Sequence, residues 1–302
     1  MLPKKVLDLF PTFEYCCPVC SAYTEPTISF CPKCKTVFDE PKWRVPPRFL
    51  KNHKTMSEYA HRILAPKLNP QQRELLLHWF TQIFADGFET EDDNFNVVWT
   101  GKDVSGGVGS ATVETLNPHH GSKNAKMVTN NVVNAYTNCY KTFSAQAITY
   151  LRYYVKLNNL PPANDNQMFL GGVADADGSD SVYSILKNVG GDIFWQLGVR
   201  ITSVYTFYTE ASASNPATGV YYCVEVLRDL TNQVATLWVD GVQKITQTGL
   251  SQTSNTAQTA IGIPYQSYAV SQTAYFDCVV VADIYIGPEI TISLKYTPHA
   301  AL

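Results

Sequence analysis

The chain has 302 residues, enough for two domains or for one large domain with attachments. Only 16% of the residues are charged, which excludes charge-driven disorder, and no apolar run approaches the ~18 residues of a membrane-spanning helix. The net charge of −3 combines unlike regions: residues 1–85 hold 12 Lys and Arg against 7 Asp and Glu, and residues 86–302 hold 11 against 19. Neither region has the dense basic stripe of a nucleic-acid-binding protein, so nucleic acid is not an expected partner.

Four cysteines near the N-terminus form a pattern that is typical of a zinc site. They are spaced as two Cys-Pro-x-Cys turns, which direct four thiolates to one point and resemble a zinc ribbon over residues 14–40. The predicted ligands are Cys17, Cys20, Cys31 and Cys34. Because all four positions are protein thiolates, the zinc (or iron, as the alternative) is expected to be structural. Residues 1–44 are therefore predicted to be a metal-stapled anchoring module, and Cys16 a bystander.

The cysteines also bear on the compartment. A thiolate zinc site needs reduced cysteines, and the start MLPKKVLDLF lacks the apolar core of a secretory signal. We therefore expect the chain to fold in the cytoplasm. Cys139, Cys223 and Cys278 lie in strand-like runs and are expected to be small buried apolar residues.

Residues 45–85 are predicted to form a short helical connector. Thr55–Glu58 has the form of a capping box, and Asn69–Gln72 places Asn at an N-cap and Pro at the first helical position. The second helix is expected to present one apolar face to the next domain or to a neighbouring subunit. That face consists of Leu76, Trp79, Phe80, Ile83 and Phe84.

Residues 86–290 are predicted to be mainly β, an antiparallel jelly-roll sandwich, because strand-length runs alternate with turn clusters and no helical period interrupts them. Asp240-Gly241 is the strongest turn signal and predicts a two-residue hairpin. Residues 291–302 are a tail. The expected strands are Asn94–Thr100, Ala147–Leu157, Gln167–Val173, Ser181–Lys187, Ile193–Ile201, Ser203–Thr209, Gly219–Arg228, Val234–Val239, Val242–Thr246 and Tyr275–Tyr285.

Three segments of this region carry a resemblance to a known family. Asp86–Glu89 looks like a first strand, Val220–Arg228 with Ala235–Val242 like a central hairpin, and Tyr275–Gly287 like a last strand of the concanavalin A-like, laminin-G-like jelly-roll sandwiches. The resemblance implies that the first and last strands pair and that Trp238 points inward. Relatives include lectins, glycan-binding modules, glycosidases, polysaccharide lyases and virion proteins, so the fold does not choose a function.

No catalytic residue is predicted. The Glu-x-Asp-x-x-Glu motif of retaining glycosidases of this fold does not occur, and Glu89–Asp93 has the wrong register for it. His119-His120 lies in a loop-forming context. The acidic balance of residues 86–302 argues against the acidic sugars on which lyases of the fold act. The chain is therefore predicted not to be an enzyme.

Two sets of carboxylates are candidates for calcium. Pairing of the first and last strands would bring Asp86, Glu89 and Asp277 together, and hard oxygens suit that ion. The run Asp175–Asp180 alternates carboxylates around a Gly turn. Asp and Gly are also ordinary turn residues, which is the simpler interpretation of both sets. The expected cofactor is zinc, with calcium a weaker second prediction.

Aromatic residues suggest a glycan-stacking surface. The candidates are Trp195, Tyr205 and Tyr208, and Tyr205 shares a face with Phe207 by the two-residue alternation of a strand. Core packing is the alternative interpretation for each ring.

Together these features predict a non-catalytic protein with the ribbon as an anchor and the sandwich displayed outward. A sandwich that usually meets glycans outside the cell, on a chain that folds in the cytoplasm, suits a virion or phage-like particle. The first prediction is therefore a structural or decorating protein whose partners are other copies of itself or other assembly proteins. The alternative is a lectin-like carbohydrate-binding protein with glycan partners, and the second alternative is a polysaccharide-cleaving enzyme. No membrane partner is expected.

Overall fold

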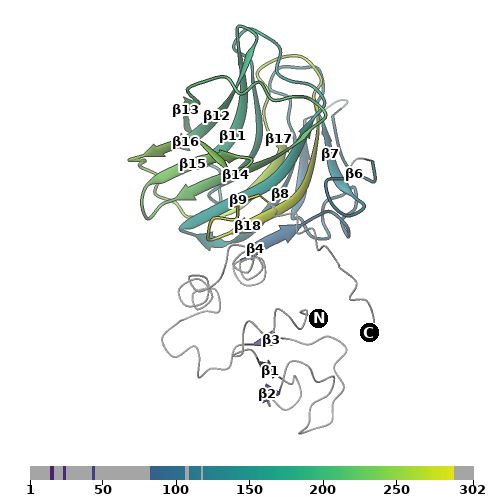
Figure 1. Ribbon diagram of the computed structural model, residues 1–302, viewed down its shortest axis with the longest axis vertical. Coiled ribbons are helices and arrows are strands. Elements are labelled where there is room, and N and C mark those ends of the chain that lie inside the picture. The colour runs from purple at the N-terminus through teal and green to yellow at the C-terminus, as the bar shows by residue number, and fades with distance from the viewer. Residues whose placement is uncertain are drawn as a thin grey trace, which may run out of the picture. The chain divides into compact units, whose positions relative to one another are not determined.

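The computed structural model describes residues 82–105, 109–116 and 118–288, together with three short strands nearer the N-terminus (Figure 1). The chain divides into two compact units, Met1–Phe80 and Thr81–Leu302. In the first unit, β1 (Glu14–Cys16) pairs antiparallel with both β2 (Tyr23–Thr24) and β3 (Trp43–Arg44). The helices predicted between residues 45 and 81 lie outside the described residues. Among those that are described, no helix is long and apolar enough to cross a membrane.

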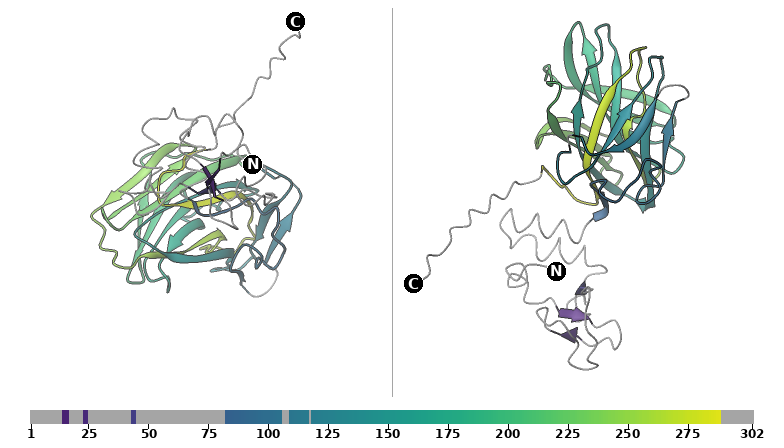
Figure 2. Two further views of the ribbon diagram at one scale, coloured as in Figure 1. Left: turned by 90° about the horizontal axis from the view of Figure 1, so that it is seen from below. Right: turned by 90° about the vertical axis from the view of Figure 1, so that its right-hand side faces the viewer.

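The second unit is an antiparallel sandwich of two sheets, which confirms the mainly β sandwich predicted for this part of the chain (Figures 1 and 2). In spatial order, the seven-stranded sheet consists of β13 (Val204–Thr209), β12 (Asp192–Ile201), β11 (Ser181–Val189), β10 (Gln167–Ala174), β17 (Thr256–Ile263), β8 (Thr137–Gln146) and β5 (Gly101–Val104). The eight-stranded sheet consists of β16 (Val242–Thr248), β15 (Val234–Val239), β14 (Tyr221–Asp229), β9 (Ile148–Leu157), β18 (Thr273–Ala282), β7 (Asn124–Val128) and β6 (Ser110–Glu114), with β4 (Gln82–Asp86) paired to β18.

The core lies between the sheets and follows the two-residue period of the strands. On β9, Leu151, Tyr153 and Val155 point inward and are fully buried, and Trp195 of β12, on the other sheet, belongs to the same core. The hydroxyl group of Tyr153 accepts a hydrogen bond from the backbone N–H of Gly171, so its polar atom is satisfied inside the core.

The predicted pairing of first and last strands is confirmed, but the strand begins earlier than expected. Asp86 is the partner of Val279, and Gln82 is the partner of Ala282. Ile83 and Phe84 therefore belong to β4, and their assignment to the apolar face of a helix is wrong. Their spacing fits a helix, yet backbone pairing with β18 and burial of Phe84 decide the outcome.

The expected strand Asn94–Thr100 is also wrong, because this stretch is a series of turns. The buried carboxylate of Glu91 accepts hydrogen bonds from the backbone N–H groups of Val97, Val98 and Trp99, at 2.8 to 3.0 Å. A side chain thus satisfies the backbone donors that a sheet would otherwise pair. The strand that follows, β5, begins only at Gly101.

The predicted hairpin at Asp240-Gly241 is confirmed. Both residues have positive φ, 51° and 75°, as the two-residue turn that matches strand twist requires. The register then places Leu237 in the core, whereas Trp238 is paired with Glu225 on the outer face. The implied inward position of Trp238 is therefore wrong by one residue, which turns a strand side chain to the opposite face.

Candidate functional site

The predicted zinc ligands Cys17, Cys20, Cys31 and Cys34 lie outside the described residues, so the zinc site stays a prediction. The neighbouring backbone shows that β1 ends at Cys16, immediately before the first ligand, with Cys16 opposite Tyr23 of β2. A paired strand therefore leads directly into the first Cys-Pro-x-Cys segment.

The three carboxylates predicted to bind calcium each receive hydrogen bonds from protein N–H or O–H groups. Asp86 accepts from the Trp99 indole at 2.7 Å, Asp277 accepts from the backbone N–H of His119 at 2.7 Å, and Glu89 accepts from Ser122. Burial raises the pKa of Asp86 and of Asp277, whereas hydrogen bonds from Ser122 lower that of Glu89. Among the described residues, no group of three or more His, Cys, Asp or Glu side chains is arranged to hold a metal ion.

The second acidic set, Asp175–Asp180, is likewise bonded within the protein. Asp175 accepts from the Ser179 hydroxyl and from the Asp180 N–H. Asp180 is buried, and its Oδ2 lies 3.8 Å from Nη2 of Arg228. A buried guanidinium group therefore faces this carboxylate.

The three predicted stacking residues divide between the two faces of the seven-stranded sheet. Trp195 is 1% exposed and belongs to the core, so it does not offer a ring to a ligand. Tyr208 also packs against the core. Tyr205 lies on the outer face beside Phe207, and their rings are nearly parallel with centroids 5.6 Å apart. Of the three, Tyr205 alone lies on the outer face of the sheet.

The outer face of the seven-stranded sheet carries an ordered line of side chains, which we call the cross-strand row. The residues between them on each strand, such as Cys139, Val182 and Leu197, point into the core, so the row points away from it. Each member is the direct register partner of the next. From one edge of the sheet to the other, the row consists of Gly101, Tyr140, Ala260, Gly172, Tyr183, Gly198 and Phe207.

Every aromatic residue of this row has a glycine beside it on the row, for a steric reason. A Cβ atom on Gly101 would lie 2.9 Å from the hydroxyl oxygen of Tyr140, and one on Gly172 would collide with the ring of Tyr183. The tyrosine rings therefore lie over the backbone of the neighbouring strand, where only glycine leaves room. This packing lays broad ring surfaces against the sheet.

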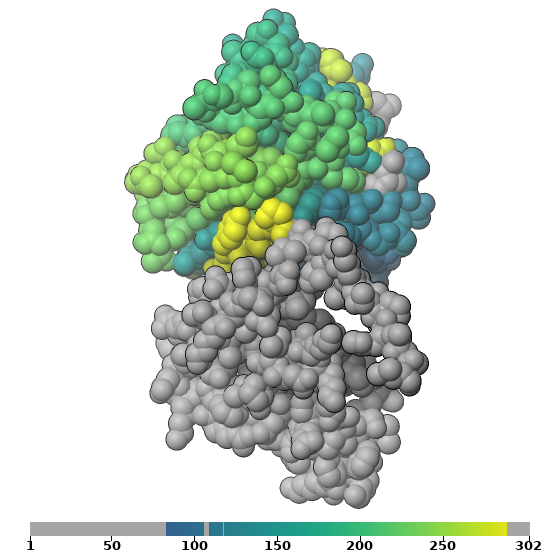
Figure 3. All heavy atoms as spheres, viewed as in Figure 1, coloured from purple at the N-terminus to yellow at the C-terminus, as the bar shows by residue number. Residues whose placement is uncertain are grey.

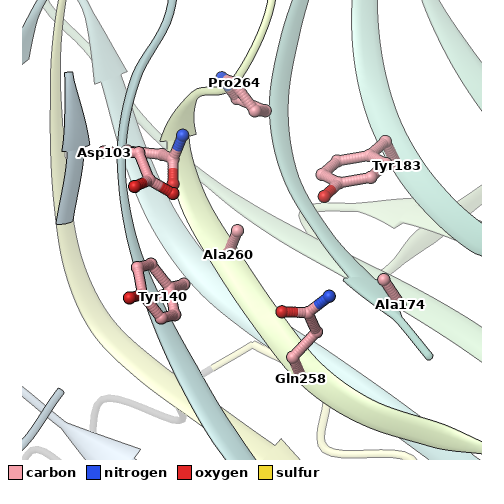
Figure 4. Close-up of a pocket in the computed structure, with 8 residues that line it drawn as sticks. Asp103, Tyr140, Ala174, Tyr183, Gln258, Ala260 and Pro264 are labelled. Atoms are coloured by element: carbon pink, nitrogen blue, oxygen red, sulfur yellow. The ribbon is translucent and has the colours of Figure 1, made fainter. Parts of the chain in front are cut away.

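A hollow of about 280 Å³ opens over the middle of the row (Figure 4). Tyr140 and Tyr183 flank it, and Ala260 lies between them in Figure 4. Amide and carboxylate groups line the same space, contributed by Asn138, Gln258 and Asp103. The hollow thus combines polar side-chain groups with the rings of Tyr140 and Tyr183.

A cluster of aromatic rings extends the site toward β13. Phe169 is buried at its centre and contacts Tyr183, Tyr205, Phe207 and Tyr265, with ring centroids 5.1 to 6.1 Å apart. Phe207 is 40% exposed, so this end of the row presents an aromatic ring to solvent. Aromatic faces with nearby hydroxyl and amide groups suit sugar rings, which present apolar C–H faces and polar edges.

The outer face of the eight-stranded sheet is organised differently. Residues 283–288 lie across it, at the surface that Figure 3 shows in yellow beside the yellow-green strands β15 and β16. Glu225 is 1% exposed and accepts hydrogen bonds from the backbone N–H groups of Ile286 and Gly287, both at 2.8 Å. Nη1 of Arg152 donates to the carbonyl oxygen of Gly287. This face is partly covered by the chain itself.

No family model matches the chain, and no curated protein matches it. Solved structures do resemble it. A cellulose-induced protein, Cip1, superposes with a TM-score of 0.52 at 16% identity, over 68% of this chain and 100% of that chain. An endo-β-1,4-glucuronan lyase from the fungus Trichoderma reesei gives a TM-score of 0.50 at 11% identity, over 68% of this chain and 96% of that one. These likenesses show the fold, an antiparallel β-sandwich shared with both proteins.

Proposed function

We propose that the chain is a carbohydrate-binding protein and that the outer face of the seven-stranded sheet is its glycan site. The observation that carries the proposal is the hollow between Tyr140 and Tyr183, continued by the exposed aromatic ring of Phe207. Two structural neighbours support it, since one is named for its induction by cellulose and the other for a reaction on a polysaccharide. These neighbours favour glycan binding over a structural role in a virion or phage-like particle.

Glycan binding should depend on the aromatic residues of this face. We expect Tyr140→Ala and Tyr205→Ala each to weaken binding at least about tenfold, because each removes ring surface from the site, and about 1.4 kcal/mol corresponds to that factor. The measurement is a glycan array with the full chain, followed by calorimetric titration of the best ligand. Product analysis of the same mixtures shows whether the ligand is also cleaved.

The matched control is Trp238→Ala, which removes a half-buried aromatic residue from the outer face of the other sheet. Thermal unfolding of all three variants establishes that they are folded. Full binding by both tyrosine variants together with loss of binding in Trp238→Ala would place the glycan on the wrong sheet and overturn the proposal.

The second part of the proposal is a structural zinc site in the N-terminal unit, held by Cys17, Cys20, Cys31 and Cys34. It is supported by the spacing of the four cysteines and by the strand β1, which ends at Cys16. Native mass spectrometry should find one zinc ion per chain. Cys20→Ser should lose it, because three thiolates no longer close the tetrahedral site, whereas Cys16→Ser should retain it. Equal zinc in both variants would contradict the assignment.

A further inference from the structure

The cross-strand row crosses every strand of its sheet, which fixes the shape of the ligand it suits. It runs from Gly101 on β5, one edge strand, to Phe207 on β13, the other. Six steps between neighbouring strands, at about 4.8 Å each, make a line of roughly 29 Å. A single sugar ring would cover a small part of that length. A chain of several linked rings would contact Tyr140, Tyr183 and Phe207 in turn.

The small side chains along the row also suit a polysaccharide that lies flat on the sheet. Gly101, Gly172 and Gly198 have no side chain, and Ala260 has only a methyl group. A Cβ on Gly198 would lie 2.6 Å from Ile185 and 3.5 Å from the Phe207 ring, so neighbouring side chains also cover this glycine. Because only Ala260 and Gly172 lie between Tyr140 and Tyr183 on the row, no long side chain projects from the sheet there.

The charges on this face favour an uncharged polysaccharide as the ligand. Both described cations near the row are engaged by the protein: Arg200 donates to the carbonyl oxygen of Gly178 at 2.7 Å and lies over Tyr205, and Lys187 lies 3.5 Å from Asp165. Among the described residues that line the hollow, the charged side chain is the carboxylate of Asp103. A uronic acid chain would bring its carboxylates toward the negative charge of Asp103, which would repel them.

We propose that the cross-strand row is the track for an uncharged polysaccharide, which lies across the strands and is bound along its length and not at its end. This inference rests on the proposed function and specifies its substrate class. The uncharged ligand expected for this chain differs from that of the glucuronan lyase with a similar fold, whose named substrate is an acidic polymer.

The test is calorimetric titration of the full chain with two matched series of probes. One series is β-1,4-linked glucose oligomers of two, four and six units, and the other is β-1,4-linked glucuronic acid oligomers of the same lengths, which differ at C6 alone. We expect affinity for the glucose series to rise at least about tenfold from the dimer to the hexamer. The glucuronic acid hexamer should bind at least about tenfold more weakly than the glucose hexamer.

Variants at one end of the row and in the central hollow separate a track from a local pocket. Phe207→Ala should reduce binding of the glucose hexamer several-fold and leave the dimer, which we expect in the central hollow, unchanged. Tyr140→Ala, in the hollow, should weaken both. Trp238→Ala on the other sheet is the control and should weaken neither.

Each outcome decides the matter. Equal affinity for dimer and hexamer, or a hexamer indifferent to Phe207→Ala, would overturn the track, while the proposed function would stand on its array result. Equal or tighter binding of the glucuronic acid series would overturn the uncharged ligand. Failure of both series to bind would overturn the inference, and absence of any glycan ligand on the array would overturn the proposed function itself.

Discussion

Replacing Arg228 by Met is expected to destabilise the sandwich by about 3–5 kcal/mol, the cost typical of breaking a buried ion pair from one side. Arg228 is fully buried, and its guanidinium group donates to Gln252, Thr256 and the carbonyl oxygen of Ser254 at 2.7 to 3.0 Å. Met fills much of the volume but leaves these acceptors, and the carboxylate of Asp180 at 3.8 Å, without the cation. Urea unfolding at neutral pH measures the loss.

The protonation state of Asp180 explains why the loss should be large. Burial would raise the pKa of this carboxyl, but backbone N–H donors from Thr202, Thr253 and Ser254, together with Arg228, hold it below its usual value. Without Arg228 the buried charge loses part of this compensation. Adding Asp180→Asn to Arg228→Met should therefore recover part of the stability.

Lys187→Met is the matched control, because it removes a cation from a pair whose carboxylate, Asp165, is exposed. Such pairs contribute within about 1 kcal/mol. If Arg228→Met lowered the free energy of unfolding no more than Lys187→Met does, the buried pair of Arg228 and Asp180 would not stabilise the fold.

The second large effect is a pH dependence centred on Glu225. Burial raises the pKa of its carboxyl from 4.5 to about 7, although the N–H groups of Ile286 and Gly287 and the cation of Arg152 act in the opposite direction. The folded protein therefore binds a proton that the unfolded chain has released between these two values. The stability from this group is fully present below pH 4.5 and is lost as the pH rises through about 7, by about 3 kcal/mol in all.

Glu225→Gln keeps the shape of the side chain and removes the titration. Between pH 5 and pH 8, we expect the free energy of unfolding of the native chain to fall by about 2–3 kcal/mol more than that of Glu225→Gln. Subtracting the two profiles cancels the other titrating groups. At pH 5 the variant is also expected to be less stable than the native chain, because its amide cannot accept both backbone N–H groups. Parallel profiles would show that Glu225 does not titrate in this range.

The sandwich could be predicted from the sequence where the local pattern and the tertiary fold agree. Ile193, Trp195, Leu197 and Val199 alternate along one strand, and the hairpin at Asp240-Gly241 carries its own turn chemistry. The strands β5, β6, β7, β8 and β17 were not predicted. β17, for example, has the sequence TAQTAIGI, which is too rich in small and polar residues to stand out as a strand, because its outer side belongs to the hollow.

The site was only partly predictable. The alternation that places Trp195 with Leu197 also predicts that its ring faces the core. Tyr208 lies three positions after Tyr205, an odd offset, so the two cannot share a face of a strand. These signals were present in the sequence. The cross-strand row was not, because Gly101, Tyr140 and Ala260 become neighbours only through the register of three strands that are far apart in the chain.

The last strand of the sandwich occupies a central place in its sheet, between β9 and β7, and it also pairs with the first strand, β4. Gln82 and Ala282 are partners in this ladder although some 200 residues separate them along the chain. During synthesis, β9 and β7 therefore each keep one unpaired edge until Thr273–Ala282 has left the ribosome. A chain that stops short of this segment would have two exposed strand edges in place of one continuous sheet, which makes truncated products prone to aggregate.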